Sequence, residues 1–271
     1  MRSLKYTRAV ALLALAAGYL TACEDPAPPK EAESTTAQKP LVPAPAPQAP
    51  DVAEAPKEEV ATPKQERKAV VCPPAPRVAF SDAALEAEVR RKASKPEGDV
   101  TLADLKKVRS VDLTRAGTKV DTLDPCIFPL LTNLHHLYLG GGELTDLSPI
   151  KTLTKLEGLR VSMNQVADLT PLAGMVQMDR LDLGRTQVMD LKPLRGMTKM
   201  TELMLDDTPV TDLSPLAGLT KLERLSIKRT RVRDLSPLKP LSKLKFLYVA
   251  GSAVEDTHSV ARPGLKISSE E

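Results

Sequence analysis

The C-terminal half of the chain repeats one pattern of aliphatic and polar positions with a period of 22. The phrase LTNLHHLYL begins at Leu131, and matching phrases begin at Leu153, Met175, Met197, Leu219 and Leu241. A second phrase of the DLSPL type follows at residues 146–150, 168–172, 190–194, 212–216 and 234–238. Such fixed spacing is typical of repeat proteins, in which each unit stacks on its neighbours.

Each half of the repeat predicts its own local structure. Where leucines alternate with other residues, the period of two predicts a short strand, and stacked copies predict a parallel sheet. Short polar side chains are expected to satisfy backbone groups at the turn after each strand, namely Asn164, Thr186, Thr208 and Thr230. The Asp and the Ser or Thr before Pro predict a cap and a short helix, because Pro loses no hydrogen bond at the first helical position.

About seven aliphatic side chains of each repeat are expected to point inward, which in one central copy are Leu203, Leu205, Val210, Leu213, Leu216, Leu219 and Leu222. A single repeat buries too little apolar surface to offset the conformational entropy lost on ordering. Neighbouring copies must supply the remaining contacts, so the array is predicted to fold only as a stack.

This phrasing resembles the internalin type of bacterial leucine-rich-repeat protein over about residues 77–256. The resemblance implies an α/β solenoid with short parallel strands on a concave face, 3₁₀ or irregular return arms and a helical N-terminal cap. The stretch FSDAALEAEVR from Phe80 looks like that cap, which is placed at residues 77–110, before repeats at 111–256. The concave face is the solvent-facing side of the strands, and in this family it usually meets the partner.

The cap has two candidate helix starts. Ser81 is the candidate N-cap of the first helix, and Thr101, with Asp104 three residues later, is that of a second. The strand at residues 111–113 then opens the array. Its Leu113 precedes Leu139 by 26 residues, so this first turn carries a four-residue insertion.

The end of the array is harder to place. Residues 257–271 are expected to be a C-terminal tail, and residues 251–271 are too short for a full cap. Four aliphatic side chains in and before this tail are expected to cover the last turn: Val254, Val260, Leu265 and Ile267.

The N-terminus has the pattern of an export signal. Three basic residues precede an apolar run at residues 9–20, which is shorter than the roughly 20 residues that span a bilayer. The following LTAC at residues 20–23 resembles the lipobox of bacterial lipoproteins. The resemblance implies that residues 1–22 are cleaved as a signal peptide and that Cys23 receives a diacylglycerol. The alternatives are an ordinary signal peptide with a chance cysteine and an uncleaved anchor.

Residues 23–76 have the composition of a linker. Thirteen of the 24 prolines lie in residues 24–76, and Ala, Pro, Glu and Lys dominate without one aromatic residue. Such a stretch cannot bury enough apolar surface to order itself, so a disordered tether is predicted. The alternative is a Pro-rich ligand for another domain.

Charge argues against a nucleic-acid partner. Without Arg2, Lys5 and Arg8 of the signal peptide, 35 of the 38 basic residues remain against 35 acidic residues. A nucleic-acid-binding protein needs a basic field, which this balance does not provide.

Two cysteines remain once Cys23 is assigned to the lipid. An even pair in an exported domain suggests a disulfide between Cys72 and Cys126. The alternative is two separate free thiols.

Variable residues face outward from the strands in columns. One column reads Tyr138, Arg160, Asp182, Met204, Ser226 and Tyr248. A second reads His136, Gly158, Arg180, Glu202, Arg224 and Phe246, and a third ends in Asp206 and Lys228. Aromatic residues at both ends with mixed charges between them predict a protein-binding or peptide-binding surface, whose candidate contacts are all of these residues except His136, Gly158 and Ser226. The alternative is a solvated face held by ion pairs such as Arg180 with Asp182 or Glu202.

The sequence contains no recognised catalytic motif. It has no Gly-x-Ser-x-Gly elbow, no His-Glu-x-x-His and no phosphate-binding loop. The adjacent His135 and His136 lack further metal ligands nearby, so they are interpreted as solvated surface residues. No catalytic residue, metal or cofactor is therefore predicted.

Together these features favour a monomeric, lipid-anchored protein that recognises a protein or peptide partner through its concave face. The expected location is the bacterial cell envelope, with the outer membrane or cell surface favoured over the inner membrane. A periplasm-facing scaffold of an envelope complex is the alternative, and an enzyme is a remote one. The repeat specifies the scaffold, and only the variable positions specify the partner.

Overall fold

The computed structural model describes Cys72 and residues 78–116 and 119–270. The predicted signal peptide, Cys23 and the linker before Cys72 lie outside these residues. The described residues all belong to one unit of the chain, Gln65–Glu271. None of the helices within them is long and apolar enough to cross a membrane.

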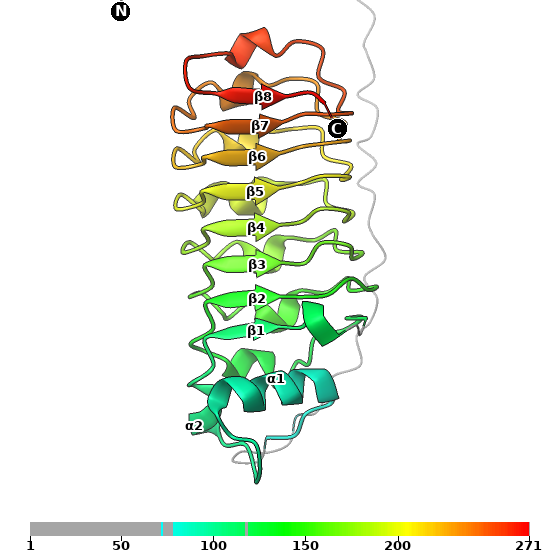
Figure 1. The fold of residues 1–271 in the computed structure, drawn as a ribbon, viewed down its shortest axis with the longest axis vertical. Coiled ribbons are helices and arrows are strands. Elements are labelled where there is room, and N and C mark those ends of the chain that lie inside the picture. Colours follow the sequence, from blue (N-terminus) through cyan, green and yellow to red (C-terminus); the bar gives the residue numbers. More distant parts are fainter. Residues whose placement is uncertain (1–71, 73–77, 117–118, 271) are drawn as a thin grey trace, which may run out of the picture. The chain divides into compact units, whose positions relative to one another are not determined.

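Eight short strands stack into one parallel sheet in chain order (Figure 1). They are β1 Ser110–Asp112, β2 His136–Tyr138, β3 Gly158–Arg160, β4 Arg180–Asp182, β5 Glu202–Met204, β6 Arg224–Ser226, β7 Phe246–Tyr248 and β8 Lys266–Ser268. In sequence number the register advances by 22 at each step from β2 to β7, and by 26 from β1 to β2. The predicted insertion in the first turn is therefore confirmed.

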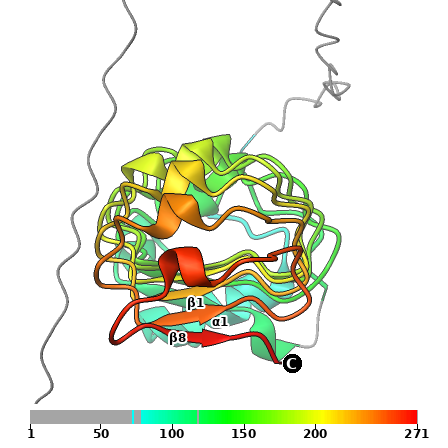
Figure 2. The same ribbon diagram turned by 90° about the horizontal axis from the view of Figure 1, so that it is seen from above.

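The connections contain short 3₁₀ helices, as predicted. These are η1 Thr114–Ala116, η2 Phe128–Leu130, η3 Ser148–Ile150, η4 Thr170–Leu172, η5 Lys192–Gly196, η6 Ser214–Leu216, η7 Ser236–Leu238 and η8 His258–Val260. Seen along the stack, helices of the return arms lie across the coil from the sheet (Figure 2). In each DLSPL-type phrase the Asp Oδ1 accepts the backbone N–H two residues later, at 2.7–2.9 Å. This turn aims the chain into the helix, where Pro takes a position that needs no donor.

Buried polar side chains close the corner after the strand. The hydroxyls of Thr186, Thr208 and Thr230 each donate to the carbonyl oxygen three residues earlier, at 2.6–2.8 Å. Asn164 donates to three carbonyl oxygens and accepts the N–H of Leu144 from the preceding coil. The predicted role of these residues is confirmed, and Asn164 also ties two coils together.

A neighbouring corner position adopts the left-handed conformation in five successive coils. Its residues are Met163, Arg185, Asp207, Arg229 and Gly251, with φ between 52° and 65°. Each non-glycine residue there costs roughly 1 kcal/mol or more. Asp207 lies between Arg185 and Arg229, whose Nε atoms are 3.4 and 2.5 Å from its carboxylate. The hydrogen bond from Arg229 lowers the pKa of Asp207 most, so Asp207 stays charged. Its ion pairs with the two arginines offset part of the backbone strain.

Two helices cap the first coil. In α1 (Ala83–Ala93), Asp82 is the N-cap, because its Oδ1 accepts the N–H groups of Ala84 and Leu85. The prediction that Ser81 caps this helix was wrong: its N–H and hydroxyl donate to Asp124 instead. A carboxylate one residue later is also the better partner for the positive end of the helix.

The second helix, α2 (Leu102–Leu105), begins as predicted. Thr101 and Asp104 form a reciprocal capping box at its N-terminus. Side chains from both helices join the core that runs through the repeats, with Leu85, Val89 and Leu105 at most 1% exposed. The cap therefore covers the open end of the leucine ladder.

The predicted C-terminal tail, residues 257–271, contains η8 and β8. β8 pairs in parallel with β7, but its register, which pairs Phe246 with Lys266, advances by two fewer positions than the repeat does. Val260 is buried, and Val254, Leu265 and Ile267 pack against the core. These four residues do cover the last turn, as predicted, but they do so as part of a shortened eighth coil.

We predict that Leu203→Asp unfolds the array. Leu203 is the middle residue of β5 and is fully buried, so a carboxylate there is desolvated without a partner. The free energy of unfolding should fall by more than about 4 kcal/mol. Thermal melting followed by circular dichroism measures this, with Met189→Asp as the control because Met189 is 63% exposed in a neighbouring coil. A melting temperature within a few degrees of the parent chain would contradict the prediction.

Candidate functional site

The candidate site is the solvent-facing side of the sheet. The strand register aligns Tyr138, Arg160, Asp182, Met204, Ser226 and Tyr248 in one row across β2 to β7. His136, Gly158, Arg180, Glu202, Arg224 and Phe246 form the parallel row two residues earlier. The structure therefore brings the predicted contact residues together on one face, although Ser226 and Gly158 are buried within it.

The N-terminal end of this face carries two stacked rings. The His136 and Tyr138 rings lie 6.1 Å apart between centroids at an interplanar angle of 16°. Gly158 of the next strand makes room for them: a Cβ at this position would lie 2.8 Å from His136 Nδ1 and 3.3 Å from the Tyr138 hydroxyl oxygen. The glycine was not a predicted contact residue, but it allows the two rings to lean over β3.

Charges pair with one another in the middle of the face. Arg160 Nε lies 3.4 Å from an Asp182 carboxylate oxygen and 3.0 Å from Ser162 Oγ. Arg224 Nη1 lies 3.6 Å from a carboxylate oxygen of Glu202. Arg180 does not form the pair with Asp182 or Glu202 that the alternative of a solvated face named. Its Nε lies 3.6 Å from a carboxylate oxygen of Asp179, beside it in sequence.

Asp206 is held by its neighbours in the next coil. Its Oδ1 accepts the hydroxyl of Ser226 at 2.5 Å and the backbone N–H of Lys228 at 2.9 Å. These contacts fix the carboxylate against the sheet. Ser226 is thereby explained as a positioning residue rather than an exposed contact.

The C-terminal end of the face combines rings with cations. Arg224 Cζ lies 5.2 Å from the Phe246 ring centroid, and Lys266 Nζ lies 5.8 Å from the same centroid. Lys228 Nζ lies 5.3 Å from the centroid of Tyr248. Lys266 was missed from the sequence, because β8 lacks the full repeat phrase. The alternation of Leu265, Lys266 and Ile267 was the signal that could have found it.

Comparison with solved structures places these features in a family. No protein-family model matches the chain, and no curated protein matches it significantly. The chain is similar to internalin C2 of Listeria monocytogenes, with 31% identity and a TM-score of 0.62, over 70% of this chain and 94% of that one. The chain belongs to the internalin family of leucine-rich-repeat proteins.

Two further solved structures share the fold. A second L. monocytogenes internalin (inlF) is 27% identical with a TM-score of 0.53, over 65% of this chain and 58% of that one. A leucine-rich-repeat protein of Leptospira interrogans shares the fold, with 18% identity and a TM-score of 0.55, over 60% of this chain and 43% of that one. Its internalin relatives support the interpretation of this chain as a protein-interaction scaffold.

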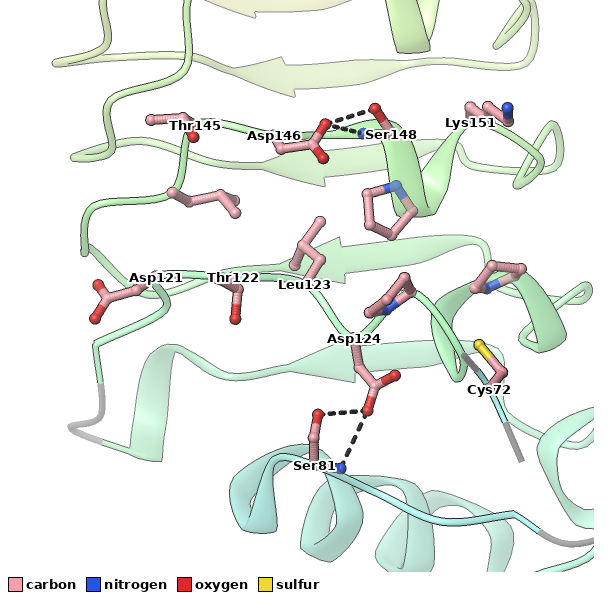
Figure 3. A pocket seen from close by; sticks show the side chains of 14 residues that line it. Cys72, Ser81, Asp121, Thr122, Leu123, Asp124, Thr145, Asp146, Ser148 and Lys151 are labelled. Carbon is pink, nitrogen blue, oxygen red and sulfur yellow. Dashed lines mark hydrogen bonds between the residues drawn. The ribbon is translucent and has the colours of Figure 1, made fainter. Parts of the chain in front are cut away.

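A groove of about 650 Å³ also lies beside the N-terminal cap of this internalin-like solenoid (Figure 3). Its walls include Leu123, Pro125, Leu144 and Pro149, together with three aspartates. Asp124 and Asp146 accept the backbone N–H two residues later, and Asp121 accepts the N–H of Glu143 from the next coil. Among the described residues, no group of three or more His, Cys, Asp or Glu side chains could hold a metal ion.

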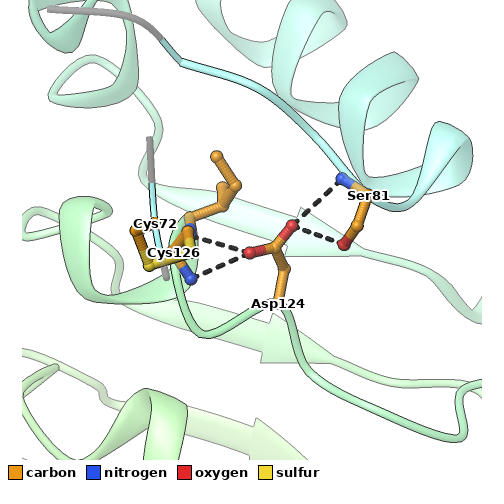
Figure 4. The surroundings of a disulfide bond; sticks show 5 residues. Cys72, Ser81, Asp124 and Cys126 are labelled. Atoms are coloured by element: carbon orange, nitrogen blue, oxygen red, sulfur yellow. Dashed lines mark hydrogen bonds between the residues drawn. A yellow bond between two sulfur atoms is a disulfide. The ribbon is translucent and has the colours of Figure 1, made fainter. Parts of the chain in front are cut away.

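Cys72, which lines this groove, forms a disulfide bond with Cys126 (Figure 4). The sulfur atoms of Cys72 and Cys126 are 1.97 Å apart, and their Cα atoms are 5.4 Å apart. Asp124 links the chain at Cys126 to the start of the cap. Its carboxylate accepts the N–H of Cys126 at 2.8 Å and the hydroxyl of Ser81 at 2.6 Å. Burial opposes ionisation of Asp124, but these hydrogen bonds outweigh it and hold its pKa below the ordinary value.

We predict that the native chain contains this bond and that it stabilises the cap. In a Cys23→Ser background only Cys72 and Cys126 remain, so the native protein should react with no thiol label before reduction and with two after it. Replacing both by Ser opens a link across 54 residues, which should cost up to about 4 kcal/mol. Intact mass spectrometry and denaturant unfolding measure the two effects. Two labels on the unreduced native protein would refute the bond.

Proposed function

We propose that this internalin-family chain is a lipid-anchored lipoprotein of the bacterial cell envelope that binds a protein or peptide partner through its concave face. The observation that carries the proposal is the composition of that face. Aromatic side chains lie at both ends of the row, and paired charges lie between them. Large rings and arginines provide most of the binding energy at protein interfaces.

The middle of the face supports recognition rather than catalysis. Its carboxylates and guanidinium groups pair with one another, and Asp206 is held by Ser226 and a backbone N–H. Such paired charges set the register and orientation of a partner more than they raise its affinity. This pairing of side chains supports a binding function for the face.

The location follows from the N-terminus. The resemblance of residues 20–23 to a lipobox supports a lipid on Cys23, and the Pro-rich linker supports a spacer between that lipid and the solenoid. An outer-membrane or surface position suits a receptor for external partners. A periplasm-facing scaffold remains the second arrangement that the same anchor allows.

Lipidation has a direct test in the full chain expressed in a bacterial host. Cys23→Ser should abolish incorporation of a fatty-acid label and move the chain from the membrane to the soluble fraction, because one thioether-linked diacylglycerol is the proposed anchor. Cys126→Ser is the matched control and should stay labelled and membrane-bound. Protease treatment of intact cells then separates the two locations, because only a surface-displayed domain is released. A Cys23→Ser chain that keeps its label would overturn the anchor.

Partner binding is tested by placing a photo-crosslinking residue on the concave face. A benzoylphenylalanine at Tyr248 or at Arg180 should form a discrete crosslinked product in envelope extract. The same residue at Met189 should not, because that exposed position lies outside the concave face. Gel electrophoresis and mass spectrometry identify the product. Crosslinking from Met189 alone, or equal products from all three positions, would argue against concave-face binding.

A further inference from the structure

The C-terminal end of the concave face collects three cations around two rings. Arg224 of β6 and Lys266 of β8 lie on either neighbouring strand of Phe246, and Lys228 lies over Tyr248. The electron-rich ring faces attract these cations and hold them at the surface. We call these five residues the cation–aromatic cluster.

The cluster has more positive than negative charge available to a partner. Within the described part of the chain, the ammonium groups of Lys228 and Lys266 form no ion pair with a carboxylate. Arg224 reaches Glu202 only at 3.6 Å, which is long for a charge-assisted hydrogen bond of about 2.7–2.9 Å. Asp206 already accepts a hydroxyl and a backbone N–H.

We propose that the cation–aromatic cluster binds an acidic stretch of an extended peptide or protein loop. Carboxylates of the partner would pair with Arg224, Lys228 and Lys266, and an apolar side chain between them would pack on Phe246 and Tyr248. Bringing an anion between two cations that flank one ring also relieves their mutual repulsion. This inference rests on the proposed concave-face function and adds the chemistry of the partner.

The surroundings of the cluster favour a short acidic segment over a polyanion. Adjacent strands are about 4.8 Å apart, so β6 to β8 spans roughly 10 Å. Directly beyond this width the face carries Glu202, Asp206 and Asp182 on β5 and β4 or next to them. A nucleic-acid strand continuing across the sheet would place its phosphates against these carboxylates. A peptide needs acidic residues over the cluster only, followed by neutral or basic ones.

The test selects peptides without assuming a partner. A displayed library of random 12-residue peptides is panned against the full chain, and the recovered peptides should be enriched in Asp and Glu. The same selection is run with a Lys228→Gln/Lys266→Gln double variant, which should lose that enrichment. Lys192→Gln/Lys221→Gln is the matched control, because both lysines are exposed outside the concave face.

Affinity is then measured by fluorescence anisotropy with the most enriched acidic peptide. The double variant should bind it about tenfold more weakly, whereas the control should bind within twofold of the parent chain. A peptide with Asn and Gln in place of Asp and Glu should lose affinity by a similar factor. Circular dichroism confirms that each variant keeps its melting temperature.

The outcomes separate this inference from the proposed function. Enriched peptides that are not acidic, or acidic peptides that bind the double variant equally well, overturn the cation–aromatic cluster but leave concave-face binding standing. Failure to enrich any peptide, together with no crosslink from Tyr248, overturns both. A 12-nucleotide single strand that binds more tightly than the acidic peptides and is lost in the same double variant assigns the cluster to nucleic acid instead.

Discussion

The burial of one leucine ladder between stacked coils is the interaction on which the rest of the structure depends. Each strand has only three residues, and its central aliphatic side chain is fully buried in β1 to β7. No coil can bury that side chain alone, because the neighbouring coils supply part of the surface that covers it. The α1 and α2 cap and the shortened eighth coil are therefore required to cover the two ends of the ladder.

The ladder also separates what the repeat must keep constant from what it can vary. The threonines, Asn164 and the Asp of each DLSPL-type phrase satisfy backbone groups at the corners, so each coil returns to the same place. That repetition aligns the outward strand positions into rows. Because those side chains hold no part of the core, they can carry rings in one coil and charges in the next without a cost to the fold.

Most of the fold could be predicted because each local pattern recurs at a fixed spacing. What could not be predicted depended on tertiary neighbours. Asp124, far along the chain, takes the hydroxyl of Ser81 and leaves the helix cap to Asp82. Arg180 pairs with Asp179, whose carboxylate also accepts the hydroxyl of Thr201 from the next coil, instead of with a carboxylate across the sheet. The eighth coil escaped notice because its spacing is shorter than that of the repeat, and with it Lys266 was missed.

The two ends and the middle of the concave face should then contribute differently to binding. Five strand spacings separate β2 from β7, or about 24 Å, which an extended peptide covers with about seven residues. Over the middle, Arg160 and Asp182 already pair with each other, so a partner gains little by pairing there. Apolar contact area is concentrated on the rings at the ends. A partner long enough to reach both ring sites therefore gains affinity from its ends, whereas the charges between them select its register.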